Sequence, residues 1–229
     1  MKTTHKKAFT LPEVIISISV MVMVIMSSTN LIVSIIRNNT QNQNTLIAYG
    51  LAQEGLEGIR NIRDSDWLLG ADFSGNLNGK AVWGLTFPTV VDQARYYRLD
   101  LNLLEPYQGT VQSKDDLLNA TPWKLFDLTD LKNATVDDRE TFGKNDKTLL
   151  YVDHDSLTEE AHYVHTDTGT KTPFHRYIII TPETYVPTAG GQPLTKSVKM
   201  RVTSVVDWQE LGRNREVRLD SELTDWREN

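Results

Sequence analysis

The sequence predicts an α+β protein in which one long N-terminal helix carries an antiparallel β-sheet head. A run of 23 residues, from Val14 to Ile36, contains no charged side chain. Helical spacing of apolar residues returns farther on and continues to about Asp64, with no proline between Pro12 and Pro88. The last part of the chain alternates apolar and polar residues, as a half-buried strand does. We therefore expect the first half of the helix to lie in a membrane and its second half to pack against the sheet.

The composition bounds the size of the protein and excludes several classes. At 229 residues the chain has room for one sizeable domain, or for a small domain plus an appendage. Lys2, Lys6 and Lys7 lie in the first eight positions, whereas the remaining residues carry 21 basic and 30 acidic side chains. Such an acidic head does not suit a protein that tracks nucleic-acid phosphates, so we expect no nucleic-acid partner. The absence of cysteine excludes disulfides, cysteine-ligated zinc and thiol catalysis.

The uncharged run predicts a single membrane span. As a helix rising about 1.5 Å per residue it is about 35 Å long, which is enough to cross a hydrocarbon core of about 30 Å. The hydroxyl side chains inside it, at Ser27, Ser28 and Thr29, can bond back to carbonyls of their own helix. Lysines precede the run and an uncharged polar stretch follows Arg37, so the positive-inside rule keeps the N-terminus in the cytoplasm and exports the chain after Arg37.

Three interpretations of the N-terminus compete: a cleaved secretory signal, an uncleaved signal anchor, and a short leader that is removed ahead of the apolar run. A secretory signal has an apolar region of about 7–15 residues followed by an A-x-A-like site. Here the run is longer, and no such site follows it. An uncleaved anchor agrees with the length and the charges but leaves Glu13 without a purpose. A carboxylate at the edge of a membrane span is costly, and it marks a functional site.

The residues around Glu13 carry a family resemblance. The segment from Lys6 to Glu13, with the sequence KKAFTLPE, resembles the cleavage motif of type IV prepilins and of the pseudopilins of type II secretion. The resemblance implies that prepilin peptidase cuts between Ala8 and Phe9 and methylates the new amine of Phe9. Most of the family has glycine where this chain has Ala8, which keeps the small side chain. The implied partners are this peptidase, other pilin or pseudopilin subunits, an inner-membrane assembly platform and the lipid bilayer.

Glu13 is the assembly residue that the resemblance implies, because it becomes the fifth residue of the processed chain. When subunits stack with an axial offset, its carboxylate can approach the amine of Phe9 in a neighbouring subunit, and a buried pair of this kind fixes register. Pro12 suits the same place, since the first turn of a helix has N–H groups without helical acceptors. The ordinary alternative is a Glu13 side chain that extends to the lipid headgroups.

The helix is expected to continue past the membrane to Asp64, with its polar side away from the sheet. That side carries Glu54, Glu57, Arg60 and Arg63, and Glu57 and Arg60 are spaced as a favourable surface pair. The segment 51–67 also resembles the place where the long helix of minor pilins and pseudopilins enters the head. The apolar face consists of Ile47, Ala48, Leu51, Ala52, Leu56, Ile59 and Ile62. The helix also contains three glycines, Gly50, Gly55 and Gly58. They could let the sheet approach closely, mark a place where the helix bends in a filament, or simply reduce side-chain bulk at a packed face.

These patterns divide the chain into a basic leader (1–8), a transmembrane half-helix (9–36), an extra-membrane half-helix (37–64) and a β-rich head (65–229). In the head, strand patterns occupy 80–87, 95–103, 148–153, 161–166 and 176–181. A terminal hairpin with one buried face is expected from Val198 to Leu223, with its turn at 210–214, and it resembles the terminal hairpin of minor pilins. Residues 105–147 have a weak pattern, in which short helical turns are suggested by Leu117, Leu118, Leu125, Phe126 and Leu128.

No catalytic residue, cofactor or metal site is expected. His162 and His165 are three residues apart, and on a strand such residues point to opposite faces. The acidic stretches at 137–138 and 153–155 could supply oxygens to calcium, which the resemblance allows because some pseudopilin heads bind it. The central glycine and the spacing of an EF-hand are absent, so solvated acidic loops are the preferred interpretation. Nucleophile-elbow, phosphate-loop and dinucleotide motifs are also absent, and the chain is not expected to be an enzyme.

The function that the sequence predicts is structural. We expect a filament subunit that is processed, waits in the cytoplasmic membrane with its head outside, and then enters a cell-surface or periplasmic filament. The irregular head favours a minor subunit, used at a tip or for initiation. Adhesion or motility, DNA uptake and type II secretion remain open. The alternative from another class is an uncleaved, single-pass, membrane-anchored binding protein whose head is extracytoplasmic.

Overall fold

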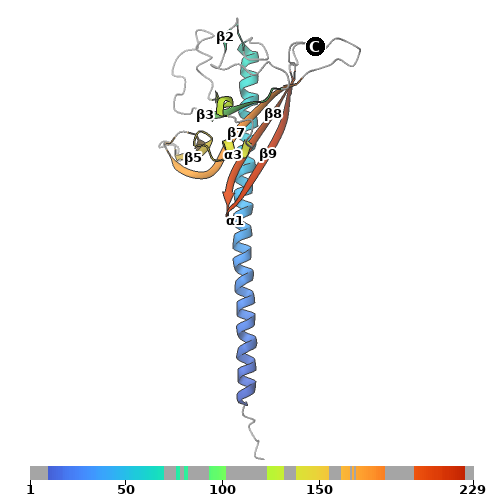
Figure 1. The fold of residues 1–229 in the computed structure, drawn as a ribbon, viewed down its shortest axis with the longest axis vertical. Helices are drawn as coiled ribbons and strands as arrows, with labels where there is room; N and C mark the ends of the chain where they lie inside the picture. Colours follow the sequence, from blue (N-terminus) through green and yellow to red (C-terminus); the bar gives the residue numbers. More distant parts are fainter. Residues whose placement is uncertain are drawn as a thin grey trace, which may run out of the picture. The chain divides into compact units, whose positions relative to one another are not determined.

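The computed structural model describes residues 10–69, 76–77, 80–81, 93–101, 123–131, 138–154, 161–165, 167, 169–183 and 199–224. Its first element is helix α1, which runs from Leu11 to Leu69 (Figure 1). The residues fall into two units, one that ends at Leu46 and one that begins at Ile47, and each is described here by itself.

The first unit consists of the apolar part of α1. Hydroxyl side chains in it donate to the carbonyl four residues earlier, so that Ser28 bonds to Val24 O at 2.8 Å and Thr29 to Ile25 O at 2.9 Å. The prediction that these hydroxyls bond within their own helix is therefore confirmed for Ser28 and Thr29. Each bond satisfies a hydroxyl donor that a hydrocarbon environment could not solvate.

The end predicted for α1, at Asp64, is wrong by five residues, because the helix continues to Leu69. Aspartate and serine lower helix propensity by only a few tenths of a kcal/mol each, so Asp64, Ser65 and Asp66 do not stop a helix that is already formed. In the sequence, the next strong helix breaker is Gly70.

The second unit is built on an antiparallel sheet of seven strands. Its longest strand, β7 (Thr170–Glu183), pairs along one edge with β8 (Lys199–Glu210), which pairs in turn with β9 (Arg213–Thr224). The other edge of β7 is shared, since residues 178–180 pair with β3 (Arg95–Leu101) and residues 170–175 with β5 (Leu149–His154). The outer strands β4 (Trp123–Asp127) and β6 (Ala161–Val164) pair with β3 and β5, respectively. A separate two-stranded ladder joins β1 (Asn76–Leu77) to β2 (Lys80–Ala81).

The predicted strands at 95–103, 148–153 and 161–166 correspond to β3, β5 and β6. Strand β7 is longer than predicted, because it includes Pro173 and begins at Thr170. Leu125 and Phe126, which suggested helical turns, instead lie in strand β4, which pairs with β3. The expected short helical turns do occur in this region, at Thr129–Leu131 and Asp138–Phe142. Leu128 lies between the end of β4 and the start of a short 3-10 helix, η1 (Thr129–Leu131). Leu117, Leu118 and most of the strand predicted at 80–87 lie outside the described residues.

The terminal hairpin turns in two residues, Leu211 and Gly212, rather than over the five that were predicted. Their φ angles are 49° and 74°, and a two-residue loop with positive φ at both positions is a type I′ turn. Glycine adopts such an angle freely, whereas an L-residue at positive φ costs about 1–2 kcal/mol. Leu211 is 70% exposed and is the residue that carries this cost.

One face of the sheet packs against residues 48–62 of α1, as the apolar pattern predicted. At one end of this contact Ala48 and Leu51 meet Phe174 and Trp208. At the other end the buried cluster consists of Leu56, Ile59, Ile62, Tyr97, Leu99, Leu125, Ile178, Ile180, Met200, Val202 and Leu223. Burying one such side chain contributes about 1.5–3 kcal/mol, so the helix is a structural part of the head.

Two of the three helix glycines make this contact possible. A Cβ at Gly55 would lie 2.5 Å from Ser204 Oγ, and a Cβ at Gly58 would lie 2.5 Å from Leu99 Cδ2. Nothing lies within 4 Å of a Cβ at Gly50. Close approach of the sheet therefore explains Gly55 and Gly58, and it does not explain Gly50.

The opposite face of the sheet is covered as well, by η1 and by the short helix α3 (Asp138–Phe142). The ring of Phe142 lies between Tyr96 and Tyr177, with ring centroids 4.7 Å and 5.0 Å apart. Val205, whose side chain points to this face, is fully buried. The expectation that the terminal hairpin has one buried face therefore holds for β9, whose burial alternates, and is wrong for the middle of β8, where both faces are buried.

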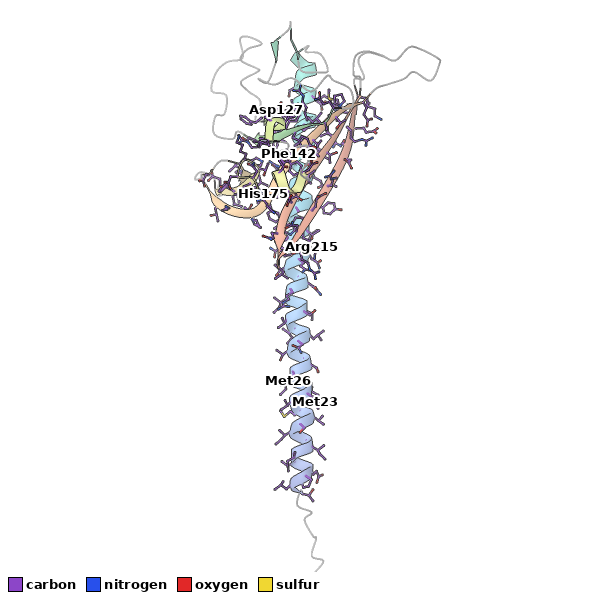
Figure 2. The ribbon with its side chains drawn as sticks, in the orientation of Figure 1. Met23, Met26, Asp127, Phe142, His175 and Arg215 are labelled. Carbon is purple, nitrogen blue, oxygen red and sulfur yellow. The ribbon has the colours of Figure 1, made fainter. Side chains whose placement is uncertain are left out.

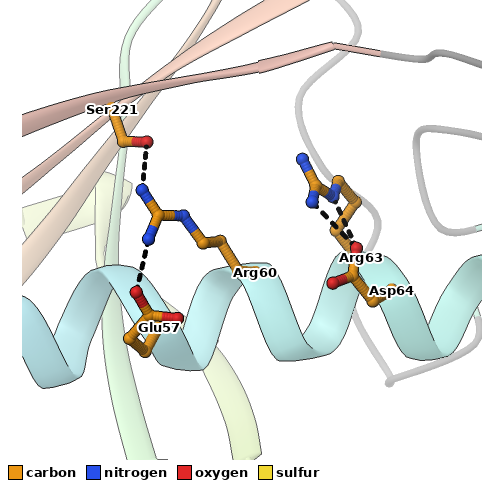
Figure 3. A network of polar contacts seen from close by, with 5 residues as sticks. All are labelled: Glu57, Arg60, Arg63, Asp64 and Ser221. Atoms are coloured by element: carbon orange, nitrogen blue, oxygen red, sulfur yellow. Dashed lines mark hydrogen bonds and ion pairs between the residues drawn. The ribbon is translucent and has the colours of Figure 1, made fainter.

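The polar side of α1 is less solvated than predicted. Glu57 and Arg60 form the expected ion pair, and Arg60 also donates to Ser221 Oγ of β9 at 3.0 Å (Figure 3). Arg63 pairs with Asp64 at 2.8 Å (Figure 3). Glu54, which was expected on the solvent side, instead forms an ion pair of 3.1 Å with Arg176, a side chain that is only 1% exposed.

Candidate functional site

The candidate site is the start of α1, which Thr10, Leu11, Pro12 and Glu13 form. The carbonyl oxygen of Thr10 accepts from the amides of Glu13 and Val14, at 3.1 Å and 3.2 Å, so the first helical turn closes on Thr10. Pro12 lies within this turn, where the N–H that it lacks would have no helical acceptor. The sequence therefore builds a proline-initiated helix whose first acidic residue is Glu13.

Glu13 is exposed and forms no ion pair with any residue that the structure describes. Its position in the first turn places an acidic side chain at the end of the helix where the helix dipole is positive, which is a favourable arrangement. Ala8 and Phe9, the predicted cleavage residues, lie outside the described part of the chain. The structure therefore places Glu13 in the first turn of α1.

The surface that follows Glu13 is apolar on every side. From Leu11 to Ile36 the large hydrophobic side chains are between 41% and 75% exposed. Met23 and Met26 are examples that project from the helix (Figure 2). The most apolar stretch of 18 residues has a mean hydropathy of 2.1, and none of it is buried inside the protein. A core helix of a water-soluble domain would be covered, so this surface needs a bilayer or other apolar helices around it.

The histidines considered as metal ligands do not converge. His165 is buried just after β6, and its Nδ1 donates to Leu149 O at 3.0 Å. His162 is half-buried within β6, where its register partner is Asp153. Across the described ranges, no three histidine, aspartate or glutamate side chains come close enough together to hold a metal ion.

The acidic residues considered for calcium are only partly described. Asp138 begins α3, and both of its carboxylate oxygens accept from Tyr96 Oη at 3.1 Å. Burial and this carboxylate raise the pKa of Tyr96 to about 12, so the hydroxyl stays a donor at neutral pH. This bond fastens α3 to β3, which is a structural role. Asp137 and Asp155 lie outside the described residues.

A shallow pocket of about 260 Å³ lies where the end of α3 meets the terminal hairpin. His175 and Asp207, which are register partners on β7 and β8, line it. His175 Nδ1 lies 3.2 Å from Asn145 O and 3.2 Å from Thr148 Oγ1, and burial lowers its pKa. Because a carbonyl only accepts, Nδ1 carries the proton, and the ring holds the loop after α3 against β7.

Sequence reasoning missed two residues of interest in the head. Arg176 joins the sheet to α1, and the signal for it was a lone arginine inside the apolar strand sequence FHRYIII. Leu211 is an exposed apolar residue at positive φ, and the signal for it was a leucine before glycine where asparagine or aspartate is usual in a two-residue turn.

No protein-family model matches the chain, and no significant match was found among curated proteins or solved structures.

Proposed function

We propose that this chain is a structural subunit of a type IV pilus-like or type II secretion pseudopilus filament. The observation that carries the proposal is the exposed carboxylate of Glu13 in the first turn of a long helix whose apolar surface nothing in its own unit covers. A permanent membrane anchor needs the apolar surface and has no use for the carboxylate. A subunit that meets identical helices uses both.

The proposed sequence of events begins in the cytoplasmic membrane. Prepilin peptidase removes residues 1–8 and methylates the amine of Phe9, the helix remains in the bilayer, and the head lies outside the cytoplasm. The subunit then leaves the bilayer through an inner-membrane assembly platform. In the filament, the apolar helix surfaces of neighbouring pilin or pseudopilin subunits replace the lipid. The role of this chain is structural, and it performs no catalytic step.

Glu13 supplies the specificity of this assembly. An unpaired carboxylate inside a bundle of apolar helices is strongly unfavourable, and so is an unpaired amine. Axial stacking brings the carboxylate of one subunit to the amine of Phe9 in the next, so only the offset that pairs them is stable. The irregular outer layer of the head, with its short η1 and α3 elements, supports a minor subunit. Such a subunit would act at a filament tip or in initiation.

The test compares filament incorporation of wild type with Glu13→Ala and Glu13→Gln. The alanine variant should insert in the membrane and fold its head normally, yet it should be nearly absent from sheared filaments, because losing one partner of a buried pair costs about 3–5 kcal/mol. The glutamine variant should fail less severely, since its amide still accepts a hydrogen bond.

Ser19→Ala is the matched control for this experiment. Ser19 is an exposed polar residue of the same helix segment, and its hydroxyl donates only to Ile15 O, at 2.8 Å. It should enter filaments as wild type does. Recovery of Glu13→Ala in filaments at the wild-type level would contradict the pairing, and Glu13 would then be a headgroup-level side chain.

A further inference from the structure

The tip of the terminal hairpin carries an apolar side chain where the fold gains nothing from it. Leu211 has a φ of 49° and is 70% exposed. At this position of a type I′ turn, asparagine, aspartate or glycine relieves the backbone and is solvated by water. Leucine neither relieves the backbone at this φ angle nor is well solvated when it is exposed. A contact with something outside this chain would explain why leucine occupies the position.

The residues after the turn are cationic and available. Arg213 and Arg215 are both exposed, and neither forms an ion pair with a residue in the described ranges. Other arginines of the head, such as Arg60 and Arg201, do form ion pairs. Glu210 is the register partner of Arg213, and Glu216 pairs with Arg218, so the two arginines leave a local positive excess on a chain whose net charge is −6. An apolar side chain flanked by arginines suits a surface of anionic lipid headgroups.

The register of the hairpin places its tip at one particular end of the head. Trp208, three residues before Leu211, packs in the cluster of Ala48 and Leu51, whereas Leu223 at the far end of β9 packs with Ile62. The tip therefore lies at the end of the head where α1 enters it. Residues 37–46 connect that end to the apolar span, and even a fully extended segment of that length reaches only about 35 Å. This connection is short enough to allow the tip to reach the membrane surface.

We infer that the hairpin tip, formed by Leu211, Arg213 and Arg215, docks on anionic phospholipid headgroups of the membrane that holds the helix. Leu211 enters the headgroup layer, and the two guanidinium groups bind lipid phosphates. This contact rests on the membrane anchorage of the proposed function and is independent of filament assembly. It holds the head of a waiting subunit against the bilayer until the subunit is extracted.

Because the chain has no cysteine, a single cysteine can carry a fluorophore at a chosen position. The full chain is labelled at Asn214→Cys, beside the tip, or at Thr224→Cys, which is exposed at the opposite end of β9. Each is reconstituted into nanodiscs of phosphatidylcholine alone or with phosphatidylglycerol, both doped with a nitroxide lipid that quenches at headgroup depth. We expect strong quenching of the label at 214 in the anionic discs, weaker quenching in the neutral discs, and little quenching of the label at 224.

The decisive variant is Leu211→Asn in the chain labelled at 214. It creates the Asn-Gly pair that type I′ turns prefer, so the head should become more resistant to denaturant, while most of the lipid quenching should be lost. A second variant, Arg213→Gln with Arg215→Gln, should lose the difference between anionic and neutral discs. Opposite effects on folding and on quenching separate membrane docking from a merely structural role for the tip.

Several results would overturn the inference. Equal quenching at 214 and 224, or quenching at 214 that survives Leu211→Asn, would do so. A fluorescence change at 214 that grows with protein concentration without lipid quenching would assign the tip to contact between copies instead. If the chain co-elutes with the discs but its label is not quenched, only the docking of the tip is contradicted. If the chain does not co-elute with the discs, the membrane anchorage is contradicted, and with it both the proposed function and the docking.

Discussion

The guanidinium of Arg176 lies 3.1 Å from the carboxylate of Glu54, which ties the longest strand of the sheet to the helix that covers it. The same guanidinium lies 3.4 Å from Leu51 O on α1 and 3.1 Å from Leu99 O on β3. It therefore joins the helix to two neighbouring strands at the place where β3 and β5 part along β7. Because the arginine is 1% exposed, water cannot replace these partners if one is removed.

The first prediction concerns this contact. Arg176→Ala should lower the free energy of unfolding of the head by about 3–5 kcal/mol. The substitution leaves the Glu54 carboxylate and the carbonyls of Leu51 and Leu99 without their partner, and it creates a cavity. Denaturant unfolding of the full chain in detergent, followed by tryptophan fluorescence, measures the change. Arg201→Gln is the matched control, because Arg201 pairs with Glu183 on the same sheet but is 55% exposed, and its loss should cost about 0–1 kcal/mol. Equal effects of the two variants would show that burial of Arg176 does not matter.

The second prediction concerns the helix glycines. Gly55→Ala and Gly58→Ala should each destabilise the head by about 1–3 kcal/mol, because the new Cβ would overlap buried Ser204 or Leu99. Gly50→Ala has open space and should stabilise by up to about 1 kcal/mol through helix propensity. Unfolding free energies of the three variants test the difference in sign. Three effects of the same sign would contradict the close helix–sheet packing.

These contacts show which parts of the fold could be predicted from the sequence. Periodic patterns identified the buried face of α1 and the terminal hairpin, because a face that packs along its length repeats at a fixed interval. Short helical turns in the outer layer were predicted, but strand β4 and the packing of those turns on the sheet were not. The five residues of β4 and the single inserted ring of Phe142 are too few to form a repeating pattern. Glu54 was assigned to solvent because its partner, Arg176, is far away in sequence. The pairing of Glu13 concerns a second molecule, and neither the sequence nor one chain determines it.

The third prediction concerns pH. Burial, and then the nearby Arg176 guanidinium, hold the pKa of His165 well below its ordinary value of 6.5. The unfolded chain therefore binds a proton below about pH 6.5 that the folded head does not, so stability is full above that pH and falls as the pH drops, by up to about 1.4 kcal/mol per pH unit for this group. Burial lowers the pKa of His175 as well, and that group adds to the loss in the same direction.

His165→Asn isolates this contribution, because its amide can still donate to Leu149 O. Unfolding free energies measured from pH 7.5 to pH 5.5, an interval of about two pH units, should fall less steeply for this variant than for wild type. Subtracting the unfolding free energies of the two proteins at each pH removes the contribution of the carboxylates, which both proteins share. An unchanged slope would mean that His165 is not held neutral in the folded head.

The fourth prediction concerns the boundaries of the head. A chain beginning at Arg37 keeps every buried residue of α1 and should be soluble and folded. A chain beginning at Ser65 lacks six buried side chains, which are Ala48, Leu51, Ala52, Leu56, Ile59 and Ile62. At about 1.5–3 kcal/mol for each large one, the loss is comparable to a whole domain stability of about 5–15 kcal/mol, so this chain should unfold or aggregate. Thermal unfolding of the two chains, followed by circular dichroism, tests this prediction. Equal midpoints would show that the helix does not complete the core of the head.

The central claim is that the chain is a processed filament subunit, and the intact mass of the protein extracted from membranes tests it most directly. The account predicts a chain that begins at Phe9, with residues 1–8 removed and one methyl group on the new amine. Ala8→Leu should instead accumulate as the precursor, because the peptidase reads a small residue before the cut. An intact chain that still begins at Met1 in filament-producing cells would contradict the account and would make this protein a permanently anchored one.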